Sequence, residues 1–147
     1  MSAFHWIFFR SRPTVAPWPA TILDLARVIE RNNAAAGATG MLLFSSTTYL
    51  QYLEARAGEI EAIWTRIAAD DRHKLVWSLP GETGTRRFPG LPLGYFDAER
   101  EHSRVQTLPI WHDRHDWHPE QAEALTGMLE TIAREKYPAA LSGGSGD

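Results

Sequence analysis

The chain has 147 residues, of which 44% are hydrophobic and 22% charged, and its formal net charge is -3. This length and composition are typical of one globular domain with a short extension, and the charge gives no electrostatic reason to expect nucleic acid or an anionic membrane as a partner. The absence of cysteine excludes disulfides, thiolate catalysis and cysteine-bound metal. With no signal peptide and no apolar run of transmembrane length, we expect a cytoplasmic protein.

The first half of the chain alternates β-favouring runs with one amphipathic stretch. An aromatic run opens it, and a segment with three prolines follows. Thr21 is the expected N-cap of the first helix, and Gly37 and Gly40 end that helix and start the next strand. The expected elements are a strand at 5–10, a loop at 11–19, a helix from 21 to about 33, and a hairpin of strands at 41–44 and 48–54.

The second half repeats the order of a helix and two strands and then adds a further helix. We expect a helix at 60–70, a strand at 74–79 stopped by Pro80-Gly81, a poor fifth strand after Phe88 interrupted by prolines, and a helix at 119–137. The order predicts a ferredoxin-like βαββαββ sandwich of the α/β (α+β) class, with both early helices on one sheet face. The expected division is a domain at 1–97, a linker and helical extension at 98–141 and a disordered tail at 142–147.

Gln51 places an amide inside an apolar strand. Because strand side chains alternate between faces, Tyr49, Gln51 and Leu53 share one face. A buried amide is costly unless its donors and its acceptor find partners. Either groups of the protein itself satisfy Gln51, or a bound ligand with hydrogen-bonding edges does, and the strand alone leaves both interpretations open.

Several short motifs follow one another in a fixed order. They are Phe9-Arg10-Ser11, Arg31-Asn32-Asn33 with Gly37-Ala38-Thr39-Gly40, Tyr49-Leu50-Gln51-Tyr52-Leu53-Glu54, Asp71-Arg72-His73 and Arg86-Arg87-Phe88. None is specific alone, but their order and spacing resemble the BLUF domains, the bacterial sensors of blue light using FAD. The resemblance covers about residues 4–95, and it implies a flavin ring held between the first two helices, over the sheet.

The resemblance also implies the residues that bind the flavin. Asn33 and Gln51 align with the asparagine and the glutamine that hydrogen-bond the ring, and an amide suits a ring edge with carbonyl acceptors beside an N–H. Arg72 and His73 align with polar residues at the flavin pocket; the alternative is a solvated helix C-terminus, where cations are favoured. Asn32 would be the ligand if the register slips by one residue, and otherwise a helix C-cap.

The chain departs from the family pattern at several positions. The family's light reaction uses a tyrosine on the first strand, which passes an electron and a proton to the excited flavin, and here that position is Phe9. A phenyl ring has no hydroxyl proton, is far harder to oxidise and cannot hydrogen-bond Gln51. Leu91 and Leu93 stand where the family often has tryptophan and methionine, and Ala38 replaces an isoleucine.

Two functions remain open. In the first, the chain is a FAD-binding blue-light sensor whose photocycle is lost or altered, and Tyr49 is a candidate substitute donor or a packing residue. In the second, flavin is absent and the fold is a protein-interaction module. We expect no enzyme in either case. The effector would be a protein partner or a second copy bound through the helix at 119–137, unless that helix packs on the open sheet face.

One cluster of metal-binding residue types occurs at 111–118. It contains His112, His115 and His118 beside aspartates, and imidazole with carboxylate suits divalent metals. A spacing of three does not keep these side chains on one face of a helix, and Arg114 adds positive charge. We therefore interpret the segment as a polar linker and expect no metal site.

Overall fold

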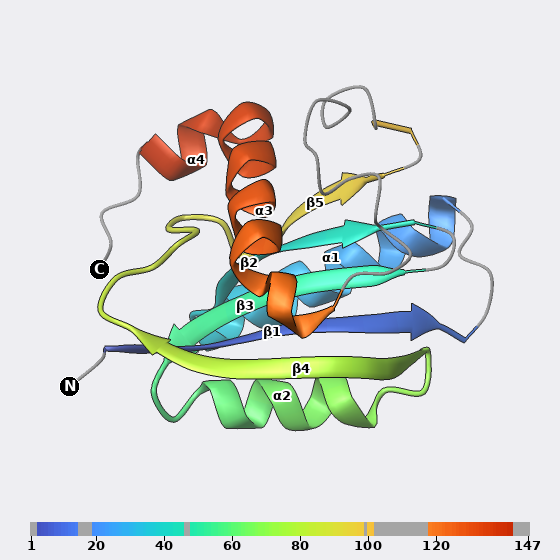
Figure 1. Ribbon diagram of the computed structural model, residues 1–147, viewed down its shortest axis with the longest axis horizontal. Helices are drawn as coiled ribbons and strands as arrows, with labels where there is room; N and C mark the ends of the chain where they lie inside the picture. The colour runs from blue at the N-terminus through green and yellow to red at the C-terminus, as the bar shows by residue number, and fades with distance from the viewer. Residues whose placement is uncertain (1–2, 15–18, 46–47, 99, 102–117, 143–147) are drawn as a thin grey trace.

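A five-stranded sheet forms the centre of the computed structural model, which describes residues 3–14, 19–45, 48–98, 100–101 and 118–142 (Figure 1). The strand order is β4-β1-β3-β2-β5, and β5 runs parallel to β2 while the other neighbours are antiparallel. The strands are β1 (Phe4–Pro13), β2 (Thr39–Phe44), β3 (Tyr49–Arg56), β4 (His73–Thr83) and β5 (Gly94–Asp97). The predicted ferredoxin-like arrangement is confirmed.

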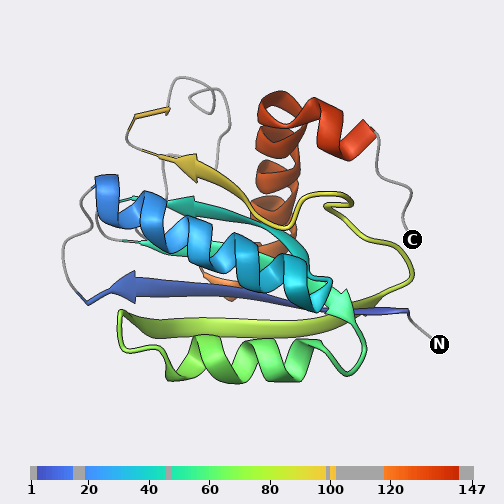
Figure 2. The ribbon, with the colours of Figure 1, turned by 180° about the vertical axis from the view of Figure 1, so that it is seen from behind.

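The helices lie on both faces of this sheet. They are α1 (Pro19–Ala36), α2 (Ile60–Ala69), the 3-10 turn η3 (Pro119–Gln121), α3 (Ala122–Lys136) and α4 (Pro138–Ser142). Figure 1 shows α3 in front of the sheet and α1 behind it, and Figure 2 shows the reverse view. As predicted, α1 and α2 pack on the same face, through residues such as Ala26 and Ile63. None of the described helices has the length and apolar character needed to cross a membrane.

Three predicted boundaries were wrong because tertiary pairing overrides local signals. β1 continues to Pro13 into the predicted loop, since β4 pairs with it throughout. β4 does not stop at Pro80-Gly81 but runs to Thr83; it is an edge strand, where the missing N–H of proline is tolerated. β5 begins only at Gly94, after both prolines.

Helix α3 covers the sheet face opposite α1 and α2. Leu125, Met128, Leu129 and Ile132 are buried against Phe8 and other residues of the largest apolar cluster. The apolar stripe of the predicted helix at 119–137 is therefore used within the chain, as the second of the two alternatives stated. The first turn of that predicted helix is the separate 3-10 turn η3. Helix α1 starts at Pro19, so Thr21 is not the N-cap of α1.

Glu54 connects β3 to the loop that precedes β5. The carboxylate is fully buried and accepts hydrogen bonds from the backbone N–H groups of Arg87 and Phe88, each at 2.7 Å, and from the Thr39 hydroxyl at 2.8 Å. Burial raises the pKa of Glu54, and these hydrogen bonds oppose the rise. The Arg87 guanidinium then pairs with Glu130 of α3 at 2.9 Å, so one buried carboxylate organises the contact between strand, loop and helix.

Candidate functional site

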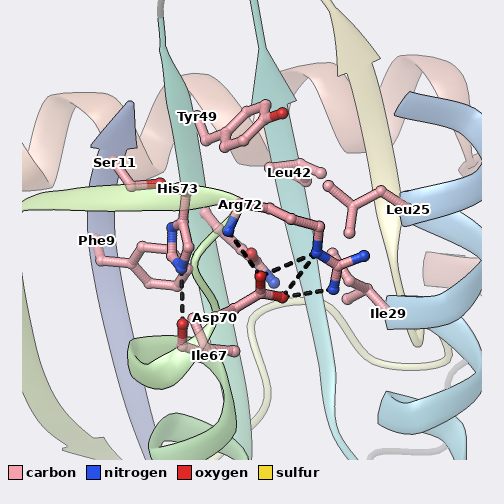
Figure 3. A pocket seen from close by; sticks show the side chains of 11 residues that line it. Phe9, Ser11, Leu25, Ile29, Leu42, Tyr49, Ile67, Asp70, Arg72 and His73 are labelled. Atoms are coloured by element: carbon pink, nitrogen blue, oxygen red, sulfur yellow. Dashed lines mark hydrogen bonds and ion pairs between the residues drawn. The ribbon is translucent and has the colours of Figure 1, made fainter. Parts of the chain in front are cut away.

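A cavity of about 70 Å³ lies between α1, α2 and the sheet. It is lined by Phe9 and Ser11 of β1, Leu25 and Ile29 of α1, Leu42 of β2, Tyr49 and Gln51 of β3, Ile67 of α2, and Asp70, Arg72 and His73 around the turn into β4. Figure 3 shows these side chains converging from the sheet and from both helices. Strand alternation explains the pairs Phe9 and Ser11 on β1 and Tyr49 and Gln51 on β3, because residues two positions apart share a strand face.

Gln51 lies at the floor of this cavity and is 4% exposed. Phe9 is its partner across the β1–β3 ladder, and Leu42 is its partner across the β2–β3 ladder. Its amide nitrogen Nε2 has no hydrogen-bond partner in the part of the chain that the structure describes. Leaving such a donor buried and unpaired costs roughly 1–3 kcal/mol. Of the two interpretations of Gln51, the geometry favours a ligand over pairing within the protein.

Ser11 supplies a second unpaired polar group to the same cavity. Its side chain is fully buried, and its Oγ makes no hydrogen bond to any other described residue. Buried polar atoms almost always have a partner, so two such atoms in one cavity make it the candidate ligand site. We did not predict Ser11 as a site residue, although its position two residues after Phe9 places it on the same face of β1.

An ion pair stands at the mouth of the cavity. Arg72 Nε donates to both carboxylate oxygens of Asp70, at 2.9 and 3.0 Å, and Figure 3 shows the guanidinium extending towards Ile29 of α1. These hydrogen bonds lower the pKa of Asp70 to about 2. The side chain of Arg72 is 55% exposed, so it can move without disturbing the core. Asp70, like Ser11, is a lining residue that was not among the predicted site residues.

His73 is half-buried beside this ion pair. Its Nε2 donates to the carbonyl oxygen of Ile67 at 2.7 Å, and its ring lies 6.2 Å from the ring of Phe9. The bond to Ile67 ties the start of β4 to the last turn of α2. Both Arg72 and His73 therefore line the cavity together with Gln51, and their contact with a flavin stays a prediction.

The two asparagines of α1 lie elsewhere. Asn33 is 2% exposed, and its Nδ2 donates to the carbonyl oxygen of Pro92 at 2.8 Å. Asn32 is exposed. Neither lines the cavity that contains Gln51. This hydrogen bond of Asn33 connects the C-terminal end of α1 to the loop before β5.

The described residues hold no cluster of metal-binding side chains. Of the histidine segment at 111–118, only His118 lies within the described residues, where it precedes η3. The predicted tail at 142–147 also falls outside them, except for Ser142 at the end of α4.

Comparison with known proteins agrees with this fold. Residues 4–94 match the family described as "BLUF: Sensors of blue-light using FAD". The blue light- and temperature-regulated antirepressor BluF of Escherichia coli (strain K12) is 30% identical over 94 residues, which make up 63% of this chain and 23% of that protein. Photoactivated adenylate cyclase subunit beta of Euglena longa is 26% identical over 93 residues, or 61% of this chain and 11% of that protein.

A solved structure extends the likeness to almost the whole chain. The dark-state structure of BlrB, a BLUF protein, superposes with a TM-score of 0.75 at 22% identity, and the match covers 90% of this chain and 98% of that one. At this identity it shows the fold alone. The matched region contains the whole cavity, from Phe9 to His73. The chain therefore belongs to the BLUF family, the sensors of blue light using FAD.

Proposed function

We propose that this chain binds the flavin ring of FAD in the cavity between α1 and α2 and serves as a blue-light sensor domain. The observation that carries the proposal is the amide nitrogen of Gln51, which is buried and has no hydrogen-bond partner among the described residues, on a side chain that lines that cavity. Family membership supports the same cofactor. When bound, a flavin supplies absorption of blue light and one-electron chemistry.

The donors in the cavity fit the polar edge of a flavin ring. Gln51 offers both an amide N–H and a carbonyl oxygen, and Ser11 offers a hydroxyl, so the two can meet carbonyl acceptors and an N–H on one ligand edge. Leu25, Ile29 and Ile67 supply apolar walls for the ring faces. Small-molecule sites commonly have this composition: a few polar groups fix the orientation of the ligand, and apolar groups provide the contact area.

The volume of the cavity sets a condition on binding. At about 70 Å³ it is well below the roughly 300–1,000 Å³ of ordinary ligand pockets. The ring therefore enters only if the walls separate, and the exposed Arg72 side chain at the mouth is the group that can withdraw at least cost. Withdrawal would also free its guanidinium to meet an anionic part of the cofactor.

We further propose that the light response differs from that of family members with a tyrosine on β1. Phe9 is 1% exposed and lies directly across the ladder from Gln51. It has no hydroxyl to accept the Gln51 amide proton and none to donate. Loss or alteration of the photocycle follows from that chemistry.

The signal would pass to another protein rather than to a catalytic site. The chain spans 11% of the cyclase subunit and 23% of the antirepressor it matches, so the activities in their names are not carried over to it. The apolar side of α3 is already packed on the sheet, so a protein effector or a second copy would bind another surface. We propose sensing without enzymatic activity.

The test is the visible absorption of protein purified in the dark with FAD present, before and after blue illumination. A bound-flavin spectrum supports the proposed cofactor, and a missing or altered shift supports the altered photocycle. An ordinary reversible shift would contradict the role assigned to Phe9. A colourless protein that takes up no added FAD would favour the second candidate, a flavin-free interaction module, because the closed 70 Å³ cavity would then be the functional state.

A further inference from the structure

Tyr49 brings a phenol into the same cavity. It is 8% exposed and is the one tyrosine among the eleven side chains that line the cavity. No tryptophan or methionine belongs to that lining. Among common side chains, phenols and indoles give up an electron most readily, so Tyr49 is the most oxidisable group in direct contact with the cavity.

The register of the sheet places Tyr49 close to Gln51. The two residues are separated by one residue on β3, so their Cα atoms are about 7 Å apart and their side chains share a face. Phe9 is the partner of Gln51 across the ladder, whereas Tyr49 precedes Gln51 by two residues on the same strand. Ser11, with its unpaired hydroxyl, is the partner of Tyr49 on β1. Both positions, 9 and 49, therefore border the same polar floor.

The phenol of Tyr49 is neutral at physiological pH. Burial raises its pKa, the Asp70 carboxylate raises it further, and the Arg72 guanidinium opposes the increase. A neutral phenol keeps its proton until an electron is removed, and the oxidised ring then releases that proton readily.

We propose that Tyr49 is the electron and proton donor to the photoexcited flavin in this chain, in the absence of a phenol at position 9. This inference rests on the proposed function. In the step, one electron would leave the Tyr49 ring and its O–H bond would break; a bound flavin, once excited by blue light, would supply the acceptor of both the electron and the proton. Return of both to Tyr49 restores the starting state, so no further oxidant or reductant is consumed.

Trp64 is a competing donor and provides the matched control. Its ring centroid lies 5.2 Å from that of the lining residue Phe9, and Trp64 itself does not line the cavity. A donor in contact with the ligand transfers an electron faster than one outside the cavity. Tyr49→Phe removes only a hydroxyl from the cavity, and Trp64→Phe removes an indole from outside it.

The test uses the full chain loaded with FAD in the dark. We expect the fluorescence lifetime of the bound flavin to lengthen several-fold in Tyr49→Phe and to stay unchanged in Trp64→Phe. A second readout is the electron paramagnetic resonance spectrum of samples frozen under blue light, in which a tyrosyl radical should be present in the wild type and in Trp64→Phe but absent from Tyr49→Phe.

An unchanged lifetime in Tyr49→Phe, or a radical that persists in it, would overturn the inference while leaving flavin binding intact. A lengthened lifetime in Trp64→Phe alone would assign the donor to Trp64. A wild-type protein that takes up no flavin would overturn the proposed function and this inference together, and the dark absorption spectrum separates that outcome from the others. Circular dichroism of each variant establishes that it is folded.

Discussion

At position 9, a single hydroxyl separates this pocket from one in which Gln51 is paired. The Phe9 ring packs 5.2 Å from Trp64 and 6.2 Å from His73, and it borders the cavity on its Gln51 side. An added hydroxyl can therefore extend into existing space instead of overpacking the core. The unpaired Nε2 of Gln51 is a donor that such an oxygen can accept from.

We predict that Phe9→Tyr is tolerated and changes the light response. The free energy of unfolding should change by less than about 1.5 kcal/mol, as for other conservative substitutions that fit the available space. The FAD-loaded variant should show a reversible red or blue shift on illumination that the wild type lacks, measured by visible absorption. Phe8→Tyr, on the opposite sheet face, is the control and should give no such shift; equal spectra for Phe9→Tyr and wild type would contradict the prediction.

The ion pair of Asp70 and Arg72 gives a second prediction, which concerns how the stability of the fold depends on pH. The pKa of Asp70 is lowered to about 2, so its contribution to stability is present above the ordinary carboxylate range and is lost as pH falls through that value. Because Arg72 is 55% exposed, the pair should stabilise the fold by less than about 1 kcal/mol.

The measurement is the urea midpoint of wild type and Asp70→Asn from pH 7 to pH 2. The wild type should be slightly more stable at pH 7, and the difference should vanish near pH 2. Asp24→Asn removes a more exposed carboxylate, 3.8 Å from Arg27, and should show no comparable convergence. A difference that grows as the pH falls would show that the ion pair does not stabilise the folded chain.

At the scale of elements, Glu54 holds the loop before β5 against β3. Both of its carboxylate oxygens accept a backbone N–H, so Glu54→Gln would replace one acceptor with an NH2 group facing a backbone N–H donor. We predict a loss of roughly 1–3 kcal/mol in the free energy of unfolding, the cost of leaving a buried donor unpaired.

Urea denaturation at pH 7 measures this loss. Glu135→Gln makes the same chemical change on the exposed side of α3 and should alter stability by less than about 0.5 kcal/mol. If the two variants were equally stable, the buried carboxylate would not be organising the loop.

For the whole molecule, α3 is part of the core rather than an appendage. Leu129 is fully buried against the sheet, whereas Leu23 on α1 is 40% exposed. We predict that Leu129→Ala costs about 2–5 kcal/mol, because it removes buried atoms and leaves a cavity. Leu23→Ala makes the identical chemical change at the surface and should cost far less.

Thermal or urea unfolding of the two variants distinguishes this packing from a helix that awaits a partner. A loss at Leu129 no larger than the loss at Leu23 would mean that α3 detaches in solution. In that case the apolar side of α3 would be available for self-association, which sedimentation of the wild-type chain would detect.

Local patterns determined much of this protein. Period-two alternation is enough to place Gln51 and Tyr49 on one face of β3, and the glycine-rich turn is explained locally by Gly37, whose φ of 69° suits glycine. Gly40 is different, because a Cβ there would lie 2.0 Å from the Tyr52 carbonyl oxygen on the neighbouring strand. The motifs along these elements also carry the resemblance that identifies the family.

Only the tertiary structure decided which polar groups pair and which stay unpaired. Asn33 bonds to Pro92, 59 residues away, and Glu54 bonds to Phe88, 34 residues away. Tertiary structure also decided the place of Pro80, which lies within a strand because β4 is at the sheet edge. It likewise decided that the Ser11 hydroxyl faces a cavity, which forms only when the strands and helices meet. Propensity and alternation act over a few neighbouring residues, whereas these contacts depend on segments that meet only when the sheet is assembled.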